Sequence, residues 1–135
     1  MDEVFKKLNY KAQKVVYSIN YPQAFEASLA SLAGDAIIKR SIVQDHDVEF
    51  VILFATKLQE VTDFTHLVTD RLKGDALVWI GYPKGTSKKY KCDFNRDSCW
   101  AAMKEFGFTA VRMVAIDDDW SAMRFRRSSY VKAGS

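Results

Sequence analysis

The sequence predicts a three-layer, Rossmann-like α/β domain, with a mostly parallel sheet of about six strands and a C-terminal antiparallel hairpin. Apolar strand segments alternate with amphipathic helical segments, which is the pattern of right-handed βαβ units. Residues 50–54 are apolar without alternation, as expected for a strand that helices cover on both faces. Only a short acidic turn separates the last two strand segments, so these strands must pair antiparallel.

The first half of the chain alternates helix and strand, and each element ends at a residue that favours a turn. Phe5 and Leu8 have helical spacing, and Asn9 can end that helix in the left-handed conformation. Pro22 suits the first turn of a helix, and Gly34 suits its C-terminal end. The predicted elements are a helix over residues 1–10, a strand over 15–19, a helix over 22–33, a strand over 37–43 and a strand over 50–54.

The second half continues the alternation and then turns to β structure. Thr56 and Gln59 have the spacing of a capping box, and Asn95 is a good N-cap. The segment from Trp120 alternates large with small or charged residues, as an edge strand does. The predicted elements are a helix from Thr56 to Gly74, a strand over 77–80, a loop over 84–94, a helix over 95–106 and strands over 108–116 and 120–126.

Length and composition predict one folded domain over residues 1–127. The chain has 135 residues, of which 48% are apolar and 27% are charged, and this is ordinary globular composition. Residues 128–135 are polar and unpatterned, so we expect a flexible tail there. The net charge of +3 is too small to indicate a nucleic-acid partner by itself.

The two cysteines predict a reducing, cytoplasmic setting. Cys92 and Cys99 are too few for a disulfide framework, and their spacing matches no common zinc pattern. The first residues lack the basic and apolar regions of a signal peptide, and no apolar run is long enough to span a membrane. We therefore predict no metal, cofactor or membrane partner.

Three segments of the second half resemble the class I methyltransferases. They are residues 48–52, residues 71–78, which contain a leucine-lysine-glycine turn, and residues 106–111, which contain a glycine-phenylalanine step. The resemblance implies a Rossmann-like fold. The chain departs from that family at residues 18–22, where the first strand ends without the family's glycine-rich loop. The ribose-binding acid has no clear counterpart, Asp45 being the nearest, and the chain is short by one strand–helix unit.

A second resemblance covers most of the chain. Residues 82–84, 95–97, 114–118 and 120–122 are similar to a family of small bacterial proteins of unknown function. This resemblance implies no known activity.

The candidate site lies where the predicted parallel strands end. Open α/β sheets bind ligands at the carboxyl ends of their strands, so the segments that follow these strands should share one edge of the sheet. The candidate ligand-binding residues are Asn20, Tyr21, Thr56, Tyr82, Lys84, Lys88, Lys89, Lys91, Asn95 and Arg96, and the candidate acidic turn is Asp117, Asp118 and Asp119.

Each candidate segment has two readings. The lysine-rich loop leads to a helix N-terminus, which favours anions, but its lysines also suit a solvated loop. Arg96 could hold an anion through a bidentate bond or pair with the acidic turn. The three aspartates could hold a hard cation, but a turn that binds its own backbone, with one aspartate paired to a loop lysine, is favoured.

The sequence favours binding over catalysis. His46 and His66 are far apart in sequence, and no nucleophile–base arrangement can be assembled from the residues present. We predict a noncatalytic binding or interaction module that takes an anionic small molecule at the carboxyl ends of the strands. The alternatives are a diverged methyltransferase-like transferase and a weak nucleic-acid binder. The nucleic-acid surface would consist of the lysine-rich loop with Tyr82, Tyr90, Arg124, Arg126 and Arg127.

Overall fold

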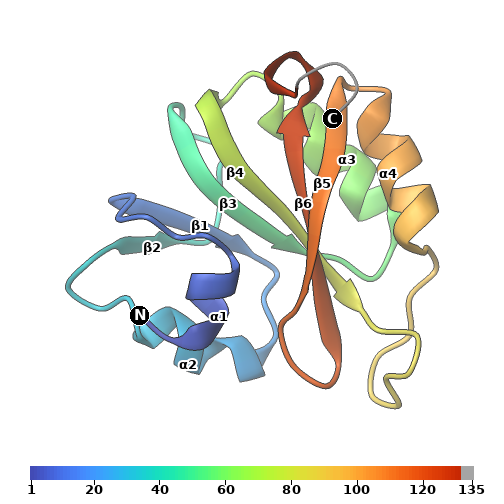
Figure 1. Ribbon diagram of the computed structural model, residues 1–135, viewed down its shortest axis with the longest axis horizontal. Helices are drawn as coiled ribbons and strands as arrows, with labels where there is room; N and C mark the ends of the chain where they lie inside the picture. Colours follow the sequence, from blue (N-terminus) through green and yellow to red (C-terminus); the bar gives the residue numbers. More distant parts are fainter. Residues whose placement is uncertain (132–135) are drawn as a thin grey trace.

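A computed structural model describes residues 1–131 and shows a six-stranded sheet between two layers of helices (Figure 1). The strands have the order β2-β1-β3-β4-β6-β5. The first four in this order are parallel, and β6 is antiparallel to both β4 and β5. The predicted three-layer Rossmann-like fold is therefore confirmed. The strands are β1 (Val15–Ile19), β2 (Ile37–Lys39), β3 (Val48–Phe54), β4 (Leu72–Pro83), β5 (Phe108–Ala115) and β6 (Trp120–Arg127).

Helices cover both faces of the sheet, and alternate side chains of β3 pack under each of the two helix layers. Phe50, Ile52 and Phe54 of β3 belong to the core under α1 and α2, whereas Val51 and Leu53 belong to the core under α3 and α4. Both sets are buried, which accounts for the uninterrupted apolar run. The helices are α1 (Glu3–Lys7), α2 (Glu26–Ala30) after a 3-10 turn (Gln23–Phe25), α3 (Leu58–Val68) and α4 (Arg96–Lys104).

The helix predicted over residues 22–33 is shorter than expected. It consists of the 3-10 turn and the five-residue α2, followed by turns over residues 31–35. Ser31 follows α2 directly, and its hydroxyl donates to the Ser28 carbonyl at 2.6 Å while accepting the Asp2 N–H at 3.1 Å. A serine hydroxyl that binds nearby backbone groups competes with regular helix, and here it also fixes the start of α1.

Helix α3 begins with a different cap from the predicted Thr56–Gln59 box. The Glu60 carboxylate accepts the N–H groups of Thr56 and Lys57, both at 3.0 Å. Asp93, from the loop after β4, accepts the Leu58 N–H at 2.7 Å. The start of α3 is therefore fastened to that loop, which a sequence pattern of local spacing does not show.

Helix α3 ends at Val68, six residues before the predicted glycine cap. Strand β4 already begins at Leu72, which pairs with Val48. Gly74 lies within β4 with a φ of 57°, next to a register shift between the Val48–Leu72 and Phe50–Leu77 pairs. The glycine supplies the left-handed conformation that an irregular strand needs, rather than a helix end.

The strand predicted over residues 37–43 ends at Lys39. The Arg71 guanidinium donates to the carbonyl groups of Ile42 at 2.9 Å, Val43 at 3.1 Å and Leu67 at 2.7 Å. These bonds hold the segment after β2 against α3. The segment therefore leaves the sheet instead of extending it.

The last two strands pair antiparallel with each other, as predicted, but β6 also pairs with β4 and is not an edge strand. It lies between β4 and β5, so β5 forms the edge and carries a register shift between Ala110 and Arg112. After β6, Ser128–Tyr130 form a 3-10 turn whose first N–H donates to the Gly107 carbonyl at 2.7 Å. The rest of the predicted tail, 132–135, lies outside the described residues. Within residues 1–131, no helix has the length and apolar character needed to cross a membrane.

Candidate functional site

The loop that follows β4 is fastened to both of its neighbours at the carboxyl edge of the sheet. The Lys84 N–H donates to the Asp119 carbonyl at 2.8 Å, and the Ser87 hydroxyl donates to Asp119 Oδ1 at 2.8 Å. On the other side, the Asp93 N–H donates to the Thr56 carbonyl at 3.0 Å. The structure thus brings the lysine-rich loop, the acidic turn and the segment after β3 together.

This loop encloses a cavity of about 440 Å³, here called the loop cavity. Lys84, Lys91 and Arg96 line it together with Asn95 and Tyr82, so five candidate residues from the sequence meet at one place. None of the described residues that line it is acidic. The full lining is Tyr82, Pro83, Lys84, Gly85, Ser87, Tyr90, Lys91, Cys92, Phe94, Asn95 and Arg96.

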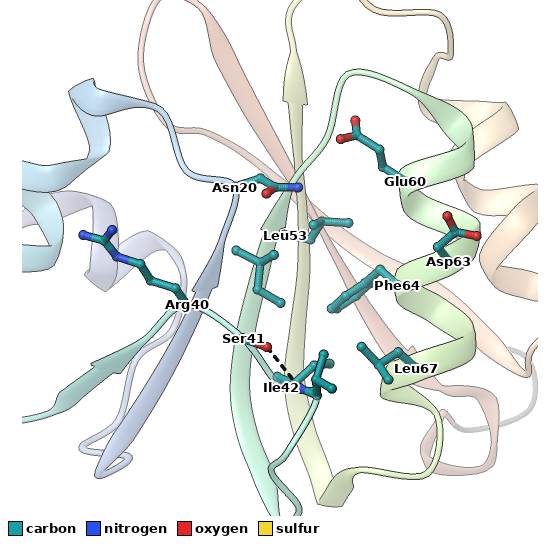
Figure 2. Close-up of a pocket in the computed structure, with 11 residues that line it drawn as sticks. Asn20, Arg40, Ser41, Ile42, Leu53, Glu60, Asp63, Phe64 and Leu67 are labelled. Atoms are coloured by element: carbon teal, nitrogen blue, oxygen red, sulfur yellow. Dashed lines mark hydrogen bonds between the residues drawn. The ribbon is translucent and has the colours of Figure 1, made fainter.

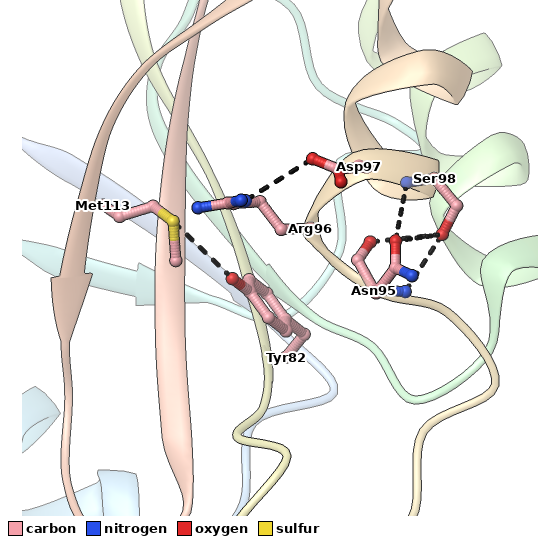
Figure 3. Close-up of polar contacts among 6 residues, drawn as sticks. All are labelled: Tyr82, Asn95, Arg96, Asp97, Ser98 and Met113. Carbon is pink, nitrogen blue, oxygen red and sulfur yellow. Dashed lines mark hydrogen bonds and ion pairs between the residues drawn. The ribbon is translucent and has the colours of Figure 1, made fainter.

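Helix α4 begins at the mouth of the loop cavity. Asn95 caps it, since Asn95 Oδ1 accepts the Ser98 N–H at 2.9 Å and the Asn95 N–H donates to Ser98 Oγ at 2.9 Å. The N–H groups of Arg96 and Asp97 have no hydrogen-bond partner among the described residues. Arg96 does not pair with the acidic turn, as one reading predicted. Its Nε lies 3.5 Å from Asp97 Oδ1, and both side chains are exposed (Figure 3).

Burial raises the pKa of two groups in the wall of the loop cavity, Tyr82 and Cys92. Burial is the main cause that raises the pKa of Tyr82, whose hydroxyl lies 3.8 Å from Met113 Sδ. Burial also raises the pKa of the Cys92 thiol, and it raises the pKa of Cys99, behind the wall, to about 12. A thiol of raised pKa is a poor nucleophile, because the thiolate is the reactive form.

The acidic turn binds its own backbone and the loop. Asp117 Oδ1 accepts the N–H groups of Asp119 and Trp120, both at 2.8 Å, while Asp119 accepts the Ser87 hydroxyl. The predicted ion pair between this turn and a loop lysine is not formed among the described residues. Within residues 1–131, no three His, Cys, Asp or Glu side chains come together in a way that could hold a metal ion.

Asn20, one of the two candidate residues after β1, lines a second cavity, of about 300 Å³, here called the β1–β3 cavity (Figure 2), whereas Tyr21 lies outside it. Strand β1 has β2 on one side and β3 on the other, and the chain crosses from one side to the other after β2. The order of the strands therefore reverses at β1. Asn20 lies at the rim with a φ of 57°, where asparagine replaces a glycine without prohibitive strain. The floor is apolar, and the rim also carries Arg40, Glu60 and Asp63.

Arg40 is a site residue that sequence reasoning missed. It lines the β1–β3 cavity and two further hollows beside α2, of about 410 and 350 Å³, and its guanidinium lies 5.3 Å from the centre of the Tyr21 ring. Because the second strand was predicted to continue to residue 43, Arg40 was placed inside it. A strand that ends at Lys39 would have put Arg40 at the carboxyl edge.

Aromatic rings connect the two ends of this edge. The Phe25 ring lies 6.5 Å from Tyr21 and 4.8 Å from Phe54. The Trp120 ring lies 5.2 Å from Phe54 and 4.9 Å from Tyr90, which lines the loop cavity. Of these rings only Tyr90 lines one of the two cavities, so the packed rings support the wall of the loop cavity.

Other basic residues lie elsewhere. Lys88 and Lys89 are exposed on the loop and line none of the cavities described above. Arg126 makes a bidentate pair with Asp75, and Arg127 donates to the Thr69 carbonyl, near the opposite end of β6 from the loop. The basic residues expected to form one nucleic-acid surface are therefore divided between the two ends of the sheet.

Comparison with known proteins gives the fold and no family. No protein-family model and no curated protein sequence matches the chain. A SAM-dependent methyltransferase from Aquifex aeolicus superposes with a TM-score of 0.63 at 13% identity, over 93% of this chain and 88% of that one. The N-methyltransferase NodS from Bradyrhizobium japonicum WM9 gives 0.55 at 13% identity, over 93% and 92%. A putative type 11 methyltransferase from Sulfolobus solfataricus gives 0.55 at 12% identity, over 95% and 79%. These likenesses bear out the methyltransferase-like architecture.

Proposed function

We propose that this chain is a noncatalytic binding module that holds a small anionic molecule in the loop cavity. The observation that carries the proposal is the charge of the cavity wall. Lys84, Lys91 and Arg96 line about 440 Å³ of space, and no acidic side chain among the described residues lines it. A volume of this size lies within the roughly 300–1,000 Å³ range of small-molecule sites.

The start of α4 supports the same ligand chemistry. The free N–H groups of Arg96 and Asp97 add a partial positive charge to that of the side chains, and such ends favour phosphate or carboxylate groups. The Asn95 cap, which the sequence predicted, fixes the helix end relative to the loop.

The groups around the loop cavity favour binding without a chemical step. No histidine lines it among the described residues, and burial raises the pKa of its Cys92 thiol. A catalytic thiol would need a lowered pKa and a nearby base. Both cysteines are free thiols, in keeping with the cytoplasmic setting that we propose.

Calorimetric titration with inorganic phosphate, pyrophosphate and a sugar phosphate tests the proposal. Replacing Lys84 or Lys91 with glutamine should weaken binding about tenfold or more, because a hydrogen bond to a charged group contributes about 1.5–3 kcal/mol. Lys88→Gln and Lys89→Gln are matched controls, since they remove the same charge from the same loop outside the cavity. We expect these controls to bind like the unaltered chain.

Two results would contradict the proposal. The first is the absence of binding by every anion tested. The second is an equal loss in the Lys84 and Lys88 variants, which would indicate general attraction to a basic loop. Protection of Cys92 from a neutral alkylating reagent gives an independent readout, because Cys92 lines the cavity and the ligand would cover it.

The β1–β3 cavity favours a second candidate function, that of a diverged methyltransferase-like transferase. It lies at the reversal of strand order, and the fold neighbours include proteins described as SAM-dependent methyltransferases. An apolar floor that includes Leu53 and Phe64 and a polar rim that includes Asn20 and Asp63 suit a ligand with apolar and charged parts. Calorimetry with S-adenosylmethionine tests it, and the variant Leu53→Trp, which fills the floor, should abolish the heat of binding. An unaltered titration curve in that variant would place the ligand elsewhere.

A further inference from the structure

A second hollow adjoins the loop cavity on the other side of Arg96. It has a volume of about 340 Å³ and lies between α4 and the edge strand β5, and it is here called the α4–β5 groove. Trp100 and Met113 line it and are 39% and 44% exposed, although both are large apolar side chains. Arg96 and Arg112 add two positive charges, and Asp97 adds one negative charge.

The groove and the loop cavity share one wall. Arg96 lines both hollows. Tyr82 lines the loop cavity and Met113 lines the groove, and these two side chains meet through the 3.8 Å contact between Tyr82 Oη and Met113 Sδ. Figure 3 shows the Arg96 side chain between Asp97 and the Tyr82–Met113 contact, with its guanidinium toward β5. A ligand held by Arg96 in the loop cavity therefore has the groove as its next available space.

We infer that the loop cavity and the α4–β5 groove together form a two-part site for an organic phosphate that carries a planar aromatic group. This inference rests on the proposed function, because the phosphate takes the anionic position in the loop cavity. The aromatic group lies in the groove against Trp100 and Met113, and Arg112 flanks it. A flat, electron-rich group suits this lining, since indole rings stack on aromatic groups and guanidinium groups lie over their faces. A mononucleotide and a simple aryl phosphate share this chemistry.

Calorimetry on the full chain separates the two parts of the site. The titrants are inorganic phosphate, ribose 5-phosphate, phenyl phosphate and uridine 5′-monophosphate. Stacking of one base contributes about 1–3 kcal/mol, so both aromatic phosphates should bind about 5- to 150-fold more tightly than phosphate and ribose 5-phosphate. Tighter binding of uridine monophosphate than of phenyl phosphate identifies a nucleotide, and the reverse identifies an aryl phosphate.

Variants of the groove should remove the extra affinity for aromatic phosphates and leave the affinity for inorganic phosphate unchanged. Trp100→Ala and Arg112→Ala should bring the aromatic phosphates to the affinity of inorganic phosphate, whose own affinity stays unchanged. Val111→Ala is the matched control, because Val111 is also an apolar residue of β5, 37% exposed, but does not line the groove. The unliganded variants should unfold at the temperature of the parent chain. Acrylamide quenching gives a second readout, since Trp79 and Trp120 are buried and a ligand in the groove would shield Trp100.

The outcomes distinguish this inference from the function on which it rests. If phosphate binds through Lys84 but the aromatic phosphates bind no more tightly, the inference is overturned and the proposed function stands. Equal effects of Val111→Ala and Trp100→Ala also overturn it. A short single-stranded oligonucleotide that binds far more tightly, through Lys88 and Lys89, would assign the surface to a polymer instead. If none of the titrants binds, both proposals fall.

Discussion

Replacing Gly81 with alanine tests how tightly β4 packs against the aromatic rings at the carboxyl edge. A Cβ atom at this position would lie 2.8 Å from Cδ2 and 3.0 Å from Cε2 of Phe54. Carbon atoms in good contact are about 3.5–4.0 Å apart, so the ring must move by several tenths of an ångström. It has little room to do so, because Phe25 and Trp120 pack against it with ring centres at 4.8 and 5.2 Å.

Overpacking of this kind costs about 1–3 kcal/mol, which lowers the unfolding temperature of a domain of this size by about 4–12 °C. Urea denaturation followed by circular dichroism measures the loss. Gly85→Ala is the control, because a Cβ atom there meets nothing within 4 Å, and we expect a change below about 0.5 kcal/mol.

A second background isolates the cause. In a Phe54→Leu chain the ring is absent, so Gly81→Ala should lose most of its cost, and the difference between the two backgrounds is the coupling between the two positions. A Gly81→Ala chain as stable as its parent, or one that loses the same stability in both backgrounds, would refute the steric argument.

Three further substitutions have definite expected results. Arg71→Ala leaves three backbone carbonyls without their charged donor, so it should destabilise the chain by about 1–3 kcal/mol. It should also speed proteolysis between residues 40 and 47, and an unchanged rate of proteolysis would contradict this argument. Burial raises the pKa of Cys99 from 9.0 to about 12, so between these two pH values only the unfolded chain ionises this thiol. The free energy of unfolding therefore falls as pH rises from 9 towards 12. Urea denaturation at pH 8, 9 and 10 should show a shallower fall for Cys99→Ala, and equal slopes would contradict the cause. Trp79→Phe removes the 3.0 Å hydrogen bond from the indole N–H to the Leu8 carbonyl and should cost about 1–3 kcal/mol in the same assay, whereas parental stability would show that the bond contributes nothing.

The alternation of elements was enough to predict the sheet, but not where its elements end. The apolar run at residues 50–54 and the short turn before Trp120 predicted the parallel strands and the antiparallel hairpin correctly. Gly74 misled the prediction of α3, because a glycine that ends a helix and one that bends a strand give the same local signal. The order of the last strands was also missed. Only the contacts with β4 place β6 inside the sheet and leave β5 at its edge.

The candidate site was predictable by region rather than by side chain. The rule for strand ends indicated the loop after β4, and the structure places five of its candidate residues around the loop cavity. The loop that carries these lysines is held by the bond between Ser87 and Asp119, residues that lie 32 positions apart in the sequence. Local spacing contains no information on such a contact, so Lys84 and Lys91 could not be separated from Lys88 and Lys89.

The position of β6 imposes an order on how a newly made chain can fold. A ribosome releases β5 before β6, yet β5 has no partner in the sheet other than β6, and β6 in turn connects it to β4. Strand β5 can therefore join the sheet only after β6 has left the exit tunnel. The N-terminal helix α1 depends on the same late event at one of its contacts, because Lys7 binds the carbonyl of Ala115 on β5. Completion of the sheet is consequently an event that follows synthesis of residues 1–127, as contacts distant in sequence require.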